Sequence, residues 1–173
     1  MPNTLDQFDI RPIEPNDKEG LQEGLTLLSN ESRRQRFFSS RKEFTENELK
    51  FFTEVDQVNH IALVAVNKSP GPSPAGSVRC IRDTHPGREH FAELAITIID
   101  SFQGMGLGFV LMDLLAQAAL KQNITHFYGD FHTSNRKMLK LLEKYCVKYH
   151  IPPQSFLLNR KSDGFLYFEM PLS

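Results

Sequence analysis

The beginning of the chain combines strand and helix periodicities. Residues 8–13 alternate apolar and polar side chains, which predicts a half-buried strand. A turn at Pro15-Asn16-Asp17 then precedes a helix over about 17–29, in which leucines three or four positions apart form one apolar stripe. A second helix is expected around Arg36-Phe37-Phe38. Thr45 and Glu48 resemble a capping box, which predicts that a third helix begins there and continues through Val55.

The middle of the chain switches to the period of strands. Residues 60–66 form a short continuous apolar run, which is typical of a central strand. The Pro-rich and Gly-containing stretch 69–74 is incompatible with regular structure and predicts a hairpin loop. Strands over 75–82 and 91–99 then complete an antiparallel meander.

The last part of the chain predicts a crossover unit. Good helix formers over 106–122 follow a glycine-rich loop, and residues 125–131 favour a strand. Asn135 is placed to cap a helix through Cys146, and residues 165–170 alternate as a final strand. We therefore expect a mixed α+β fold in which one crossover unit makes the sheet partly parallel.

Composition and charge narrow the function classes. A length of 173 residues suits a single domain, expected to span 1–173, and 40% hydrophobic with 24% charged residues is typical of globular proteins. The formal net charge of −1 gives no reason to expect a nucleic-acid or membrane partner. The start of the chain lacks a signal-peptide pattern, and neither Cys80 and Cys146 nor the six histidines have metal-ligand spacing. We expect a cytoplasmic enzyme or binding domain, monomeric or homodimeric, without a metal.

The stretch Gln103-Gly104-Met105-Gly106-Leu107-Gly108 carries the strongest chemical signal. It lies between a predicted strand and a predicted helix. Glycines at alternate positions permit positive φ angles and let a ligand approach the backbone. The helix start adds unpaired N–H groups and the positive end of the helix dipole, which suit a pyrophosphate. The alternative is a plain strand-to-helix turn.

Two common phosphate-binding motifs do not fit this stretch. A P-loop would end in Gly-Lys-Ser/Thr, but Gly108 is followed by Phe109 and Val110. The dinucleotide fingerprint would need Gly or Ala where Phe109 stands, and Asp130 only imitates its ribose-binding acid. If this stretch binds a phosphate group, its spacing therefore favours neither of these two classes of ligand.

The spacing Gln/Arg-x-x-Gly-x-Gly/Ala, met by Gln103, Gly106 and Gly108, resembles the acetyl-CoA loop of the Gcn5-related N-acetyltransferase (GNAT) superfamily. From about residue 8 to residue 146 the chain is similar, in order, to the Pat-type bacterial protein lysine acetyltransferase domains. That similarity is carried by Leu28–Ser32, Arg36–Phe38, His60–Val66, Ala92–Ala95 and Asn135–Leu139. It implies the GNAT fold, which is a central twisted mixed sheet of about six to seven strands with helices on both faces. It also implies transfer of an acetyl group from acetyl-CoA to a primary amine, with protein lysine favoured.

The resemblance also implies roles for individual residues. The backbone of Thr97, Ile98 and Ile99 would hold the pantetheine arm, and an N–H, that of Ile98 above all, would stabilise the oxyanion. The residues Gln103, Gly104, Met105, Gly106, Leu107 and Gly108 would hold the pyrophosphate. Asn135 would contact the cofactor, or would only cap its helix.

Glu93 is the candidate general base. A free lysine amine has a pKa of about 10.4, so a base must take its proton at neutral pH. Glu93 stands at the strand position that supplies this base in the Pat-type domains, and we expect it to be buried between Ala92 and Leu94. The alternative is an ordinary outward-facing glutamate. Many family members carry a thiolate-protonating tyrosine where this chain has Leu142, so no general acid is assigned, although Tyr128 or solvent could substitute.

Several alternatives remain open at the level of sequence. The acceptor could be a small-molecule amine, or the chain could be a non-catalytic module that senses acetyl-CoA. A binder of another phosphate ligand is a third possibility. The basic stretch of Arg33, Arg34, Arg36, Arg41 and Lys42 fits a solvated helix face, or a surface that recognises an acidic substrate.

Overall fold

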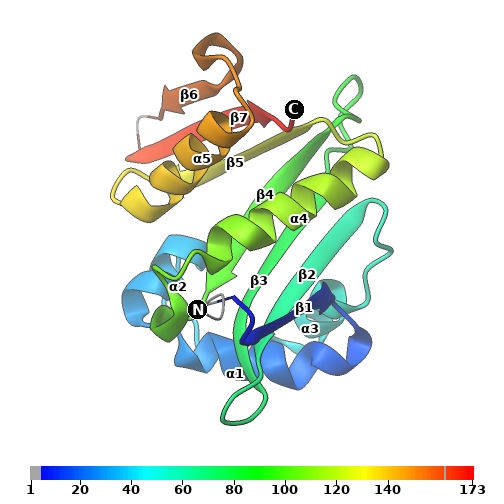
Figure 1. The fold of residues 1–173 in the computed structure, drawn as a ribbon, viewed down its shortest axis with the longest axis vertical. Helices are drawn as coiled ribbons and strands as arrows, with labels where there is room; N and C mark the ends of the chain where they lie inside the picture. The colour runs from blue at the N-terminus through cyan, green and yellow to red at the C-terminus, as the bar shows by residue number, and fades with distance from the viewer. Residues whose placement is uncertain (1–4, 162) are drawn as a thin grey trace.

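Seven strands form one twisted sheet in the computed structural model, which describes residues 5–161 and 163–173 (Figure 1). The sheet order is β1-β2-β3-β4-β5-β7-β6, and the parallel pair is β4 with β5. The strands are β1 (Phe8–Pro12), β2 (His60–Asn67), β3 (Ser73–Arg82), β4 (Phe91–Ile98), β5 (His126–His132), β6 (Leu157–Arg160) and β7 (Phe165–Pro171). The expected mixed α+β class is confirmed.

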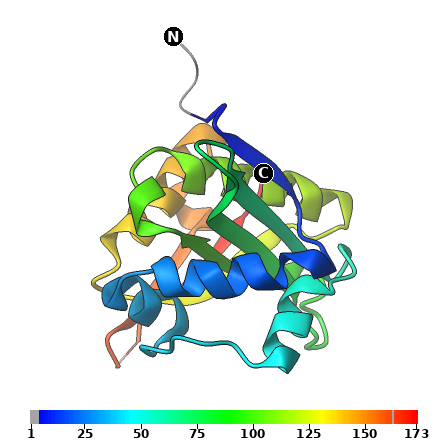
Figure 2. The ribbon, with the colours of Figure 1, turned by 90° about the horizontal axis from the view of Figure 1, so that it is seen from below.

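Five α-helices in the described part of the chain cover the two faces of the sheet, which Figure 2 shows from below. They are α1 (Lys18–Leu27), α2 (Asn30–Phe37), α3 (Glu46–Thr53), α4 (Leu107–Lys121) and α5 (Arg136–Lys148), with short 3-10 turns at Pro15–Asp17, Asp100–Phe102 and Pro153–Ser155. The main core lies between the sheet and the two helices α4 and α5, where Leu111, Leu115 and Phe127 are fully buried. Smaller clusters around Leu25 and Ala62 lie under α1 on the opposite face. No described helix is long and apolar enough to cross a membrane.

The structure corrects several of the expected boundaries. Strand β3 begins at Ser73, so Ser73 and Pro74 lie in the strand and not in the loop expected over 69–74; they pair with Asn67 and Val66 beyond a register shift in β2. The first helix stops at Leu27 instead of residue 29, because the Ser29 side chain accepts a hydrogen bond from Ser32 N (3.1 Å) and caps the next helix. The capping box at Thr45 and Glu48 is confirmed, with Glu48 N 3.2 Å from Thr45 Oγ1, but that helix ends at Thr53.

Strand β6 was not predicted. Its four residues are all exposed, so they show no alternation between a buried and a solvated face. Only the antiparallel ladder with β7 makes this segment a strand, and such a ladder cannot be recognised from local periodicity.

Candidate active site

A cavity of about 540 Å³ opens where β4 and β5 part. The two strands pair only over Phe91–Glu93 and His126–Tyr128, although both continue for several residues beyond. Directly after the last pair the two backbones still lie close together, since a Cβ on Gly129 would lie 3.4 Å from the carbonyl oxygen of Leu94. The strands are no longer paired beyond this point. The open edge of β4 therefore becomes one wall of the cavity.

Backbone direction on β4 decides which residues can bond a ligand in this cavity. Ile99 N donates to Ala75 O on the β3 side at 2.9 Å. Because successive strand residues point their backbone groups to opposite edges, Thr97 also faces β3 and Ile98 faces the cavity. The Gln103 Nε2 bond to Ile98 O (2.9 Å) agrees with this direction and leaves the Ile98 N–H facing the open edge.

The glycine-rich stretch lies at the end of the cavity. Gly104 and Gly106 have φ angles of +78° and +88°, and a Cβ on either would meet no atom within 4 Å. Gly106 is the N-cap of α4, and no side chain caps this helix. The first amides of α4 therefore keep their donors for a ligand, and the dipole places partial positive charge there.

Gln103 connects three elements through its side chain. Its amide nitrogen reaches Ser32 Oγ of α2 at 3.3 Å, besides Ile98 O of β4, and its oxygen accepts from Lys137 Nζ of α5. This side chain therefore links the walls of the cavity, and the backbone N–H of Gln103 is itself bonded to Asp100 O at 3.2 Å.

The structure brings most of the predicted site residues to this cavity. Those that line it are Glu93, Thr97, Ile98, Gln103, Gly104, Gly106, Gly108 and Asn135. Leu107 is buried in the core instead, and Met105 packs against the core. Ile99 is not brought to the cavity, because its N–H and its carbonyl are bonded to Ala75 and Phe102 within the chain.

Glu93 lies at the apex of the separation. It is the last β4 residue paired with β5, directly opposite Tyr128. The expected burial of Glu93 is wrong: the side chain is exposed, because strand alternation turns Ala92 and Leu94 into the core and Glu93 to the other face. Its carboxylate is therefore accessible from the α1 side of the sheet.

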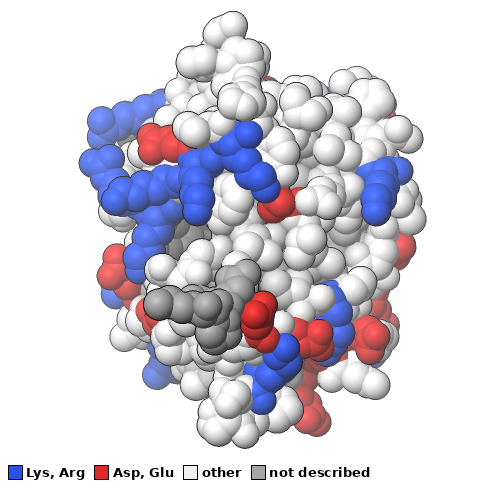
Figure 3. All heavy atoms as spheres, in the orientation of Figure 1, with Lys and Arg blue, Asp and Glu red and all other residues white. Residues whose placement is uncertain are grey.

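Asn135 caps α5, since its Oδ1 accepts from Met138 N at 3.0 Å. Three lysines on the same helix line the cavity and were not singled out from the sequence: Lys137, Lys140 and Lys144. Their spacing of three and four places them on one helix face, which is the signal that could have found them. Figure 3 shows the positive charges gathered over α5.

The tyrosines offer limited acid chemistry in this cavity. Tyr145 is buried and donates to Leu172 O at 3.0 Å, so it is held away from the cavity. Tyr128 neighbours Glu93 across the strand pair, and burial raises the pKa of its hydroxyl. No group of His, Cys, Asp or Glu able to hold a metal ion occurs among residues 5–161 and 163–173.

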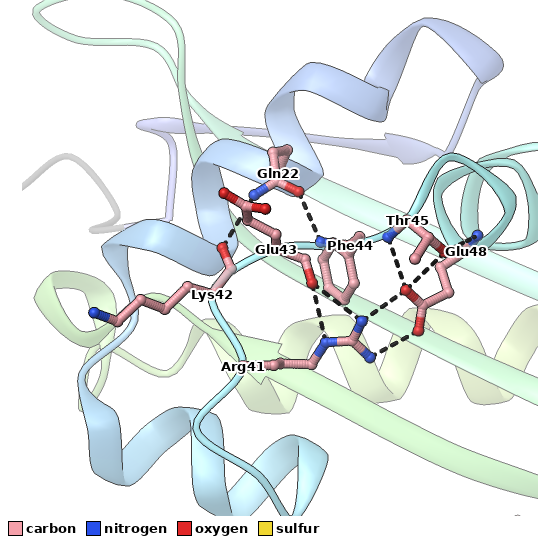
Figure 4. Close-up of polar contacts among 7 residues, drawn as sticks. All are labelled: Gln22, Arg41, Lys42, Glu43, Phe44, Thr45 and Glu48. Carbon is pink, nitrogen blue, oxygen red and sulfur yellow. Dashed lines mark hydrogen bonds and ion pairs between the residues drawn. The ribbon is translucent and has the colours of Figure 1, made fainter.

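The basic stretch after Asn30 does not act as one unit. Arg33 is buried and bonds Leu25 O and Asn30 Oδ1. Arg41 forms a bidentate pair with Glu48 at 2.7 and 2.6 Å (Figure 4). Arg36 differs from both, because it reaches Thr97 Oγ1 at 3.1 Å and lines the cavity.

Comparison with known proteins agrees with this geometry. Residues 26–146 match the acetyltransferase (GNAT) family. Acetyltransferase Pat of Mycolicibacterium smegmatis is 33% identical over 141 residues, which make up 82% of this chain and 41% of that protein. The chain thus spans less than half of the length of Pat. Acetyltransferase PA5475 of Pseudomonas aeruginosa is 30% identical over 133 residues, or 76% of this chain and 70% of that protein.

The similarity extends to three dimensions. The crystal structure of the GNAT domain of S. lividans PAT superposes with a TM-score of 0.78 at 25% identity, over 94% of this chain and 89% of that one. The family match over residues 26–146 and the identity to Pat show that this chain belongs to the GNAT family of acetyltransferases.

Proposed function

We propose that this protein transfers the acetyl group of acetyl-CoA to a primary amine, with the cofactor bound in the cavity between β4 and β5. GNAT acetyltransferases use acetyl-CoA, and the chain is a member of that family. The observation that carries the proposal is the uncapped start of α4, which meets a turn with two positive-φ glycines at the end of this cavity. Main-chain amides of 104–108 would hold the pyrophosphate there, whereas the Gln103 N–H is already bonded to Asp100 O.

Lys137, Lys140 and Lys144 would add electrostatic attraction for the phosphates. All three side chains are exposed and line the cavity from α5. Coenzyme A carries several negative charges, and lysine ammonium groups attract phosphate as point charges. These lysines would increase the association rate and affinity of the cofactor, and their effect would weaken with salt.

The pantetheine arm would follow the open edge of β4. Ile98 and Ile96 direct their backbone groups to this edge by the alternation of the strand. A backbone contact from Thr97 does not fit this edge, because its backbone groups face β3, and Ile99 would not take part. The Ile98 N–H would donate to the oxyanion of the tetrahedral intermediate, which is the place where negative charge develops.

Glu93 would accept the proton of the attacking amine. Its carboxylate is exposed at the apex of the cavity, where the thioester would end. Removal of a positioned base costs about 10²- to 10⁴-fold in rate. The amine nitrogen attacks the thioester carbonyl, the oxyanion collapses, the C–S bond breaks, and CoA leaves as a thiolate that takes a proton from solvent or Tyr128.

Protein lysine is the favoured acceptor, because the similarity to Pat-type domains extends over most of the chain. A small-molecule amine is the second candidate. A non-catalytic acetyl-CoA sensor is the third, and it would need no base at Glu93.

A thiol-release assay with acetyl-CoA against a panel of amines and lysine peptides tests the proposal. Glu93→Gln should lower turnover by at least 10²-fold while CoA affinity changes little. Glu19→Gln, an exposed position on α1, is the matched control and should keep full turnover. Bound CoA without turnover of any amine would favour the sensor, and unchanged turnover in Glu93→Gln would remove this residue from the mechanism.

A further inference from the structure

A second cavity, of about 270 Å³, lies on the opposite side of β4, between the sheet and α1. Its walls are largely apolar and include Leu25, Phe37, Phe44 and Phe52. Arg36 and Arg79 add two guanidinium groups, and we call this space the arginine cavity. It adjoins the cofactor cavity, because Leu28, Arg36 and Thr97 line both.

The two arginines are held here without a carboxylate. Arg79 is only 4% exposed, donates through Nη1 to Phe52 O (3.0 Å), and lies over the Phe52 ring. Arg36 bonds Thr97 Oγ1 through Nε and lies over Phe37. Neither guanidinium takes part in an ion pair within residues 5–161 and 163–173.

Such an arrangement is costly unless an anion completes it. Burial of a charge without an opposite charge is unfavourable, and two like charges add repulsion. Burial lowers the pKa of Arg36 to about 10, and burial with the nearby charge of Arg36 lowers the pKa of Arg79 to about 9. Of the other charged groups lining the cavity, Asp17 is paired with Arg11, and Glu23 is exposed on α1.

The cavity also has a fixed shape at its outer wall. Phe44 lies in the segment between α2 and α3, and this segment is held at both ends (Figure 4). Gln22 of α1 bonds Phe44 N (2.9 Å) and Lys42 O (3.2 Å), while Arg41 grips Glu48. A site with walls held in this way loses little entropy when it takes a ligand.

The strand register places the positive charge of Arg79 near Glu93. Arg79 on β3 is opposite Ala95 on β4, so Glu93 is its diagonal neighbour on the same face of the sheet. The charge of Glu93 also acts on Arg36. A molecule whose amine meets Glu93 and whose carboxylate meets the arginines would therefore bridge the two groups.

We propose that the arginine cavity binds a carboxylate of the acceptor, so that the enzyme selects amines that carry a carboxylate on the same molecule. This inference rests on the proposed function. The carboxylate would come from a free amino acid, or from an acidic residue beside a target lysine. In either case a guanidinium group would donate two parallel hydrogen bonds to the carboxylate oxygens.

The sharpest test compares 6-aminohexanoate with hexylamine, which differ only by a carboxylate in place of a methyl group. Wild-type protein should prefer 6-aminohexanoate by about 10- to 100-fold in KM, and in affinity measured by calorimetry with CoA bound. Arg79→Gln and Arg36→Gln should each remove most of this preference. Arg79→Lys should keep part of it, and Arg34→Gln, an exposed change on α2, should keep all of it.

Peptides with Glu or Gln beside the lysine identify the source of the carboxylate. Thermal denaturation of each variant controls for the structural bond from Arg79 to Phe52, and KM for acetyl-CoA should be unchanged in Arg79→Gln. Equal use of charged and uncharged acceptors by the wild type, or a preference that survives both arginine changes, would overturn the inference. Arginine-dependent binding of 6-aminohexanoate without acetylation of any amine would support the cavity and contradict the proposed function.

Discussion

At the scale of single residues, backbone conformation decides what the cofactor cavity can bind. Gly104 and Gly106 both adopt the left-handed region, where a β-carbon is unfavourable even with open space around it. The sequence therefore carries glycine where the backbone turns at the end of the cavity proposed to bind the cofactor. The same stretch explains why Leu107, one position later, belongs to the core: α4 has begun, and its side chain points inward.

Gly106→Ala should separate strain from ordinary packing effects. The substitution should lower the free energy of unfolding by about 1 kcal/mol and weaken CoA binding, because Gly106 has a φ of +88°. Gly20→Ala is the matched control, since its β-carbon also meets nothing within 4 Å but Gly20 lies in helix α1. It should leave CoA affinity unchanged and raise stability slightly. Equal effects of the two changes on CoA affinity would contradict the assignment.

His60, which contacts Arg79, should make the free energy of unfolding depend on pH. Burial, with the nearby charge of Arg79, lowers the pKa of His60 to about 4, and its Nε2 lies 3.1 Å from Arg79 Nη1. The unfolded chain therefore binds a proton more readily, so stability should fall as pH drops from about 6.5 to about 4 and the contribution should level off below that.

Each unit of pKa difference is worth about 1.4 kcal/mol, so the loss should be about 1–3 kcal/mol, with solvent screening favouring the lower end. Urea unfolding of wild type and His60→Gln between pH 7 and pH 4 measures it. The variant should show the shallower decline, and identical slopes would show that His60 takes up its proton equally in the folded and unfolded states.

At the scale of elements, local pattern was sufficient for most helices and strands but not for the site they build. Alternation found β1 and β7, and capping residues found α3 and α5. The separation of β4 from β5 depends on pairing that stops at Glu93, and no local signal marks such an end. The prediction that Glu93 is buried is wrong for a similar reason, because the packing of the neighbouring layer decides which face of a strand is covered.

The juxtaposition of Arg36 with Arg79 was also beyond sequence reasoning. Arg36 stood within a basic stretch on a helix, and Arg79 stood on a predicted strand without any motif. Only the packing of α2 and α3 against the sheet brings both to one cavity.

The lysines on helix α5 should contribute to CoA binding through their positive charge. Replacement of Lys137, Lys140 and Lys144 by Gln should weaken CoA binding and flatten its dependence on salt, because these exposed lysines line the cavity. Lys121→Gln, at the end of α4, is the control. Titration with CoA at low and high salt measures both effects, and a triple variant with wild-type salt dependence would argue against phosphate contacts from α5.

At the scale of the whole molecule, the arginine cavity and the cavity between β4 and β5 lie side by side and share Arg36 and Thr97 as lining residues. The cofactor would enter from the side of α4 and α5, and the acceptor from the side of α1 (Figures 1 and 2). The opening beyond Glu93 would let the thioester reach the acceptor without crossing the core. A ligand that binds only the folded protein should also stabilise it, by about 2.7 kcal/mol at a hundredfold excess over Kd.

The most direct test of this account is calorimetric titration of the protein with CoA, ATP and NAD under identical conditions. We expect CoA to bind one site per chain, at least tenfold more tightly than either nucleotide. CoA that does not bind, or a nucleotide that binds as tightly, would contradict a diphosphate site at the start of α4 and the acetyl transfer that depends on it.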